Sequence, residues 1–170
     1  LQGGETPAFS LSPRALSYLR GRPFEDNNPD RARTLFAEGL EELALTPETF
    51  PTVTISYWTD PAVKAMMEAV QSQLRKVLNI DVRLEPLDRG TYLHRVFSGE
   101  YEMLNLALNV WVHDPSSNLD LFKFQKTVIN GTGWSDTEYT PLLDLAAVAI
   151  DPEERKRYFQ KAEECIMTQL

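Results

Sequence analysis

The chain has 170 residues, of which 42% are hydrophobic and 25% are charged, and its net charge is −8. This composition is typical of a globular protein with a domain-sized core, and the scattered basic residues argue against a nucleic-acid partner. No apolar stretch approaches the roughly 20 residues of a membrane span, and the single cysteine, Cys165, excludes an internal disulfide bond.

Residues 1–27 are rich in proline, glycine and polar side chains and show no sustained hydrophobic period. We therefore predict an extended lead-in with one short helical turn around residues 14–18. The chain starts at Leu1, and its first residues lack the basic start and apolar centre of a signal peptide. We expect it to be a piece of a longer protein.

Residues 28–99 carry alternating helix and strand patterns with clear start and stop signals. The hydrophobic spacing predicts helices at 29–43, 61–78 and 89–98, and half-buried strands at 53–57 and 80–85. The expected helix caps are Asn28, Asp60 and Asp88 at the starts and Asn79 and Gly99 at the ends.

The apolar run at residues 103–110 predicts a third strand, buried on both faces. Strands separated by helices are parallel as a rule, so the expected fold is α/β, a β-α-β-α-β core with a small, mainly parallel or mixed sheet flanked by helices. Polar turn residues follow this strand, at the place where open α/β sheets bind ligands.

The C-terminal third is predicted to be helical. A short helix at 119–124 is expected with Asn118 as its cap, and two longer helices are expected at 140–150 and 152–168. Cys165 falls in the apolar stripe of the last helix, so we interpret it as a structural thiol. The acidic pair Glu163-Glu164 is expected on a solvated helix face.

No residue pattern points to catalysis, a cofactor or a metal. His94 and His113 are 19 residues apart and lack companions at metal-ligand spacing. Trp111 and Asp114, which follow the apolar run, suit a ligand site. Each also has a structural interpretation, since Trp111 fits a core and Asp114 before proline is a common turn former.

Several segments, taken in order, resemble the C-terminal lobe of family 5 solute-binding proteins, the oligopeptide- and dipeptide-binding components of ABC importers. The segments are PDRARTLFAE at 29–38, the strand at 53–57, NIDV at 79–82, WVHD at 111–114 and GWS at 133–135. The likeness covers residues 28–170, and family members carry W-x-A-D-Y or a close variant where this chain has WVHD.

The resemblance implies a ligand site in this turn. Asp114 would pair with the α-amino group of a bound peptide, Trp111 would line a side-chain pocket, and His113 would change the pocket floor. The backbone at Val110 and Val112 would pair with the peptide main chain as an added strand.

Two positions depart from the family pattern for holding a peptide carboxylate. Oligopeptide binders carry an arginine three residues before the tryptophan, where this chain has Leu108, and a histidine that shares the task falls at Phe97. Both positions are apolar here. These departures from the usual C-terminal clamp leave three interpretations open: longer peptides, another clamp or a non-peptide solute.

The resemblance further implies a two-lobed, type II periplasmic binding protein-like fold. Residues 1–27 would be the lead-in and residues 28–170 a single lobe, with the other lobe absent from this sequence. The expected function is peptide capture for an ABC permease by a monomer, in the periplasm or lipid-anchored outside the cytoplasmic membrane. The alternatives are a family member for a non-peptide solute, such as a metal chelate, sugar or modified peptide, and a small α/β enzyme.

Overall fold

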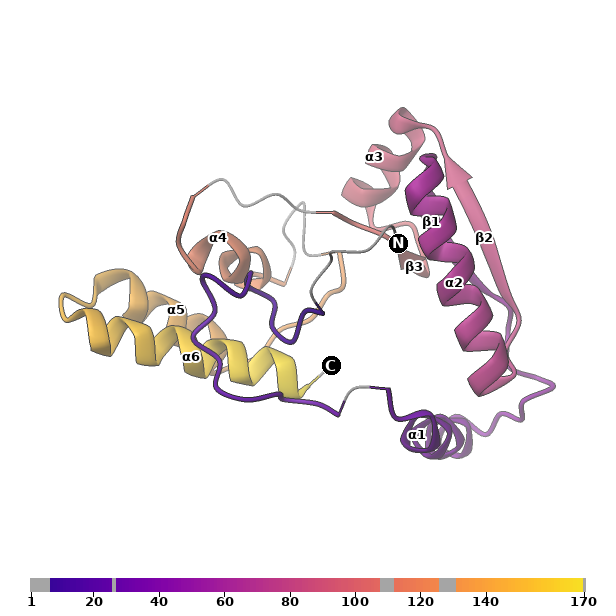
Figure 1. Ribbon diagram of the computed structural model, residues 1–170, viewed down its shortest axis with the longest axis horizontal. Coiled ribbons are helices and arrows are strands. Elements are labelled where there is room, and N and C mark those ends of the chain that lie inside the picture. The colour runs from indigo at the N-terminus through magenta and orange to yellow at the C-terminus, as the bar shows by residue number, and fades with distance from the viewer. Residues whose placement is uncertain (1–6, 26, 108–111, 126–130, 170) are drawn as a thin grey trace. The chain divides into compact units, whose positions relative to one another are not determined.

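The computed structural model describes residues 7–25, 27–107, 112–125 and 131–169, and the chain forms two compact units. Unit 1 contains the described residues 27–107, and unit 2 contains the described residues of 4–25 and 108–170 (Figure 1). The structure defines each unit by itself and so does not test the expected division into a lead-in and a single lobe, which stays a prediction.

Unit 1 alternates helices and strands around a parallel sheet. Its elements are α1 (Pro29–Glu42), β1 (Val53–Trp58), α2 (Pro61–Leu78), β2 (Val82–Leu87), α3 (Arg89–Ser98) and β3 (Met103–Leu104). The strand order is β2-β1-β3, with Val53 beside Val82 and Ile55 beside Met103, and both pairings are parallel. The predicted parallel β-α-β-α-β core is confirmed.

Local capping chemistry fixes the helix ends of unit 1. The side chains of Asn28, Asp60 and Asp88 accept hydrogen bonds from the first backbone N–H groups of α1, α2 and α3, as predicted. The α2 and α3 helices stop at Asn79 and Gly99, whose φ angles are 55° and 71°. This left-handed conformation is accessible to asparagine and glycine, which explains why they occupy the two positions.

The two faces of the sheet are covered by different helices. On one face, α2 packs over β1 and β2, and the buried residues of this cluster are Ile55, Tyr57, Met67, Ile80 and Val82. On the other face, Tyr92 and Val96 of α3 pack with Leu87 and Leu104. The two faces of the sheet therefore carry separate apolar clusters, and Ile55 and Tyr57 of β1 belong to the first of them.

The third strand is shorter and more exposed than predicted. Residues 105–107 are not in a strand, and 108–110 lie outside the described residues. Met103 is 42% exposed, so the expectation of burial on both faces is wrong for this residue. The reason is that β3 is an edge strand and α2 packs over β1 and β2, so nothing comparable covers the face on which Met103 lies beside Ile55.

Unit 2 is built from helices and an irregular segment. Its elements are α4 (Ser116–Leu119), the short 3-10 helix η1 (Asp120–Phe122), α5 (Tyr139–Val148) and α6 (Pro152–Thr168). Helices α5 and α6 run side by side (Figure 1). With Leu119 of α4 they form one core, whose other buried residues are Tyr139, Leu143, Ala146, Phe159, Ala162 and Ile166. No described helix in either unit is long and apolar enough to cross a membrane.

The start of α4 corrects one predicted cap. The helix begins at Ser116, two residues before Asn118, so Asn118 lies inside the helix and is not its cap. Its side-chain Nδ2 instead donates to the carbonyl of Leu11 at 3.2 Å. The side-chain amide of Asn118, which the local pattern predicts as a helix cap, therefore binds a backbone carbonyl more than a hundred positions away.

Residues 7–25 contain no helix or strand and are anchored by a buried carboxylate. The segment makes one turn, in which the N–H groups of Leu16 and Ser17 donate to the carbonyl of Pro13, as predicted. Glu163 of α6 is only 1% exposed. Its oxygens accept hydrogen bonds from Ser12 N at 2.9 Å and from Ser17 Oγ at 2.7 Å. The expectation that Glu163 is solvated is wrong, because these donors take the place of water.

Candidate functional site

The structure describes three of the five predicted site residues. Asp114 lies in the turn before α4 in unit 2, and Val112 and His113 precede it with exposed side chains. Val110 and Trp111 lie outside the described residues, as does Leu108. Phe97 belongs to α3 in unit 1 and is 57% exposed. The turn at Asp114 is therefore the part of the predicted site that the structure describes.

Asp114 forms a two-pronged ion pair with Arg155 of α6. Arg155 Nη1 donates to Asp114 Oδ2 at 2.7 Å, and Nη2 donates to Oδ1 at 3.1 Å. This arrangement matches the planar guanidinium fork to the planar carboxylate, which is the strongest geometry for such a pair. The two residues are 41 positions apart, so no spacing rule in the sequence indicated the contact.

The turn itself holds the Asp114 carboxylate from a second direction. Ser116 N donates to Asp114 Oδ1 at 3.0 Å, and the backbone N–H of Asp114 donates to the carbonyl of Val112 at 2.8 Å. Pro115 between them is buried. The turn-forming and ligand-binding interpretations of Asp114 are thus compatible, because the turn uses only part of the carboxylate.

Arg155 is fixed by two further contacts within unit 2. Its Nε donates to the carbonyl of Ala146 at 3.1 Å, and its guanidinium carbon lies 4.6 Å from the centre of the Phe159 ring. Ala146 belongs to α5 and Phe159 to α6, so the packing of these two helices sets the position of the guanidinium group. A cation above an aromatic face is itself a favourable contact.

The ion pair keeps Asp114 ionised. Hydrogen bonding to Arg155 is the largest cause that lowers the pKa of Asp114 to about 2, and partial burial acts in the opposite direction. The same contact raises the pKa of Arg155. Asp120 lies close enough for the charge of Asp114 to raise its pKa, although burial is the larger cause.

The Asp114 carboxylate is partly accessible from outside the protein. Within the described residues, Oδ1 receives the N–H of Ser116 and one Arg155 N–H, and Oδ2 receives the other Arg155 N–H. Hydrogen bonding to the Ser116 side chain also lowers the pKa of Asp114. The side chain is 23% exposed, which is compatible with a further contact from a ligand N–H.

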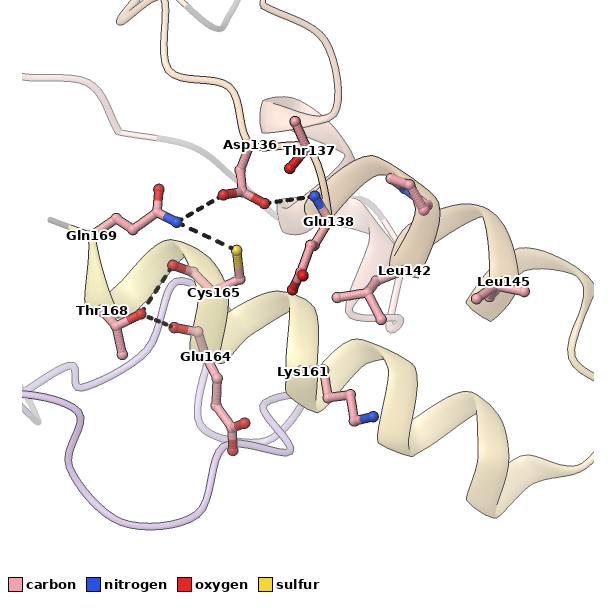
Figure 2. Close-up of a pocket in the computed structure, with 11 residues that line it drawn as sticks. Asp136, Thr137, Glu138, Leu142, Leu145, Lys161, Glu164, Cys165, Thr168 and Gln169 are labelled. Carbon is pink, nitrogen blue, oxygen red and sulfur yellow. Dashed lines mark hydrogen bonds between the residues drawn. The ribbon is translucent and has the colours of Figure 1, made fainter.

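A separate groove of about 760 Å³ lies between α5 and α6, and none of the predicted site residues lines it (Figure 2). Gln169 Nε2 donates to Asp136 Oδ2 at 2.8 Å beside the thiol of Cys165. Burial is the main cause that raises the pKa of Cys165 to about 11, so the thiol is unreactive near neutral pH, as expected for a structural cysteine.

Metal-ligating side chains do not gather anywhere in the described part of the chain. Among residues 7–25, 27–107, 112–125 and 131–169, no three His, Cys, Asp or Glu side chains are placed to hold a metal ion. The chemistry available at Asp114 is therefore that of an ionised acceptor in a polar turn.

Comparison with curated proteins gives relatives that are named as peptide binders. The chain is 28% identical over 166 residues to the oligopeptide-binding protein OppA of Bacillus subtilis, covering 95% of this chain and 30% of that protein. It is 25% identical over 175 residues to the dipeptide-binding protein DppE of the same species, covering 99% and 32%. The chain thus spans about a third of the length of these relatives.

Solved structures show the same fold. Haemophilus influenzae OppA in complex with RPPGFSPFR matches with a TM-score of 0.88 at 21% identity, over 99% of this chain and 34% of that one. The murein tripeptide binding protein MppA of Escherichia coli matches with a TM-score of 0.84 at 23% identity, over 98% and 33%. The predicted type II binding-protein fold is confirmed by these matches.

A family model gives the assignment directly. The model described as bacterial extracellular solute-binding proteins, family 5, Middle, matches residues 1–130, which is well over half of the 170 residues. The chain therefore belongs to the family 5 bacterial extracellular solute-binding proteins.

Proposed function

We propose that the protein containing this chain captures peptides outside the cytoplasm and delivers them to an ABC permease in the membrane. The names of the relatives, oligopeptide-binding OppA and dipeptide-binding DppE, support this proposal. So does the bound RPPGFSPFR in the structure of Haemophilus influenzae OppA. The protein works in the periplasm or attached to the outer face of the cytoplasmic membrane, and its action is binding and release.

Asp114 is the proposed contact for the α-amino group of the peptide. The observation that carries this role is an ionised carboxylate whose side chain is 23% exposed. A protonated amine would make a charge-assisted hydrogen bond with Oδ2, whereas an acetylated amine has lost its charge. The site would thus favour peptides with a free N-terminus.

The neighbouring residues complete the proposed site. Val110 and Val112 would pair with the peptide main chain in the manner of an added strand. The carbonyl of Val112 already accepts from Asp114 N at 2.8 Å and from Ser117 Oγ at 2.9 Å, so the pairing at Val112 would use its N–H. Trp111 would line a side-chain pocket, and His113, also exposed, would form part of the floor.

Calorimetry with the full-length protein tests the amine contact. A peptide and its N-acetylated form are titrated into the wild type and into Asp114→Asn. We expect the substitution to weaken binding of the free-amine peptide by about 10- to 100-fold, because hydrogen bonds to charged groups contribute about 1.5–3 kcal/mol. Binding of the acetylated peptide should change little. Asp144→Asn, which removes a 62% exposed carboxylate of the same unit, is the matched control.

A second candidate is a protein that holds the peptide through its main chain without an amine contact. One observation favours it, because Arg155 already balances the charge of Asp114. In this case, the wild type would bind free-amine and acetylated peptides equally, and Asp114→Asn would affect both alike. The same titrations therefore distinguish the two candidates.

A further inference from the structure

We propose that Arg155 is a positioning residue for ligand recognition, which holds the Asp114 carboxylate in the orientation that receives a ligand N–H. This inference rests on the proposed function, in which Asp114 receives the peptide amine. It adds a residue on the last helix that does not itself touch the ligand.

The geometry of the ion pair gives Arg155 this role. Its two Nη atoms bind the two carboxylate oxygens at 2.7 and 3.1 Å, which fixes both the distance and the plane of the carboxylate. Ser116 N adds a third donor, on Oδ1. A carboxylate that is held at both oxygens keeps one orientation towards a ligand, whereas a free aspartate side chain rotates and samples many.

Arg155 can position Asp114 because it is held in turn by both long helices of unit 2. The carbonyl of Ala146 on α5 accepts from Nε at 3.1 Å, and the ring of Phe159 on α6 lies under the guanidinium group. The chain of contacts runs from the α5–α6 packing through Arg155 to the carboxylate. A lysine at this position could supply the charge but not the two-pronged geometry.

Arg155 also determines the pH range of the site. Its guanidinium group opposes the partial burial of Asp114, which favours the protonated carboxyl. The charge of Asp114 in turn raises the pKa of Asp120 in η1. Ser116 of α4 is uncharged, and His113 beside Asp114 is exposed. Without Arg155, the Asp114 carboxyl would take up a proton at a higher pH and would lose its attraction for an amine.

The experiment measures amine discrimination against pH in the full-length protein. Discrimination is the dissociation constant of an N-acetylated peptide divided by that of its free-amine form, measured between about pH 3.5 and pH 7, where the peptide amine stays protonated. Other carboxyl groups titrate in both complexes, so their effects largely cancel in this ratio. The variants are Arg155→Met, Arg155→Lys and, as a matched control, Arg157→Met, which changes an exposed arginine on the same helix.

We expect the wild type and Arg157→Met to keep their discrimination across this range. In Arg155→Met, discrimination should be lost on acidification, with a midpoint about 1–3 pH units above the wild-type one. Arg155→Lys should keep a nearly wild-type pH profile but discriminate less at neutral pH. An Arg155→Met profile identical to that of the wild type would overturn the inference.

Two further results separate the possible failures. If Asp114→Asn removes discrimination and Arg155→Met leaves its pH profile unchanged, the positioning role fails while the amine contact stands. If Asp114→Asn leaves discrimination unchanged, the proposed amine contact itself fails. Should Arg155→Met not fold, NMR titration of the Asp114 carboxyl in the unmodified protein replaces it. We expect Asp114 to stay ionised to about pH 3.5, and a midpoint above that pH would overturn the inference.

Discussion

The backbone N–H of Ser12 donates to the carboxylate of Glu163 at 2.9 Å, although 151 positions separate the two residues. Ser17 donates its hydroxyl to the other oxygen of the same carboxylate at 2.7 Å. Glu163 is 1% exposed, so these donors stand in for the water that the carboxylate has lost. The irregular segment and the last helix are therefore joined through one buried charge.

Replacing Glu163 by glutamine should lower the free energy of unfolding by about 1–3 kcal/mol. The amide oxygen can still accept from Ser12 N, and the NH2 group can donate to the Ser17 hydroxyl, so the two charge-assisted hydrogen bonds become weaker neutral ones. Urea unfolding followed by circular dichroism gives the value. Glu164→Gln makes the same change next to it, at a partly exposed position, and should cost less than about 0.5 kcal/mol. Equal losses in the two variants would contradict this account.

The Asp114–Arg155 pair should make stability depend on acid. The pKa of Asp114 is about 2 in the folded protein, below its ordinary value of 3.8. At pH values well above 3.8, this lowered pKa stabilises the folded state by about 2 kcal/mol. The contribution is lost as the pH falls from about 5 towards 2. Asp114→Asn should lower the free energy of unfolding at pH 7. It should also make that free energy fall less steeply between about pH 5 and pH 3. Urea unfolding at several pH values in this range measures the dependence, and the control Asp144→Asn should show the same dependence on pH as the wild type.

Tyr139→Phe should destabilise unit 2 by about 1–3 kcal/mol. The Tyr139 hydroxyl donates to the carbonyl of Leu119 at 2.8 Å, and both residues are almost fully buried. Phenylalanine fills the same space but leaves that carbonyl without this donor. Tyr158→Phe removes a hydroxyl that pairs with Glu154 near the surface and should have a much smaller effect. Thermal or urea unfolding of both variants gives the comparison.

Cys165 should react slowly with iodoacetamide in the folded protein. Its pKa is raised to about 11, chiefly by burial, so about one thiol in a thousand is ionised at pH 8. The alkylation rate of the peptide containing Cys165, followed by mass spectrometry, should rise about tenfold per pH unit up to that value. The protein unfolded in urea provides the control and should react much faster near pH 8. A rate that levels off near pH 9 in the folded protein would be inconsistent with the raised pKa.

The sequence alone predicted features whose cause is local. The helix starts at Asp60 and Asp88 and the ends at Asn79 and Gly99 follow from hydrogen bonds or backbone angles within a few residues. The parallel sheet followed from the same elements, because a helix between two strands leaves few ways to connect them. The family resemblance, which depends on the order of these segments, is confirmed.

Features that depend on distant residues were not predictable in this way. The burial of Glu163 requires donors from Ser12 and Ser17, and a glutamate beside another glutamate on a helix is usually solvated. The partner of Asp114 is Arg155, at a spacing that no motif describes. Met103 is exposed because α2 packs over other strands, and an apolar run does not show which strand lies at an edge.

The two-part construction of unit 2 has a consequence for synthesis. The helices and strands of unit 1 all lie within residues 29–104, so its sheet can form as soon as that stretch has left the ribosome. Ser12, by contrast, is made 151 residues before Glu163, which is about 8–30 s earlier at ordinary rates of translation. During that interval, the N-terminal segment has no carboxylate to bind, and a chaperone or a protease would meet it before α6 does.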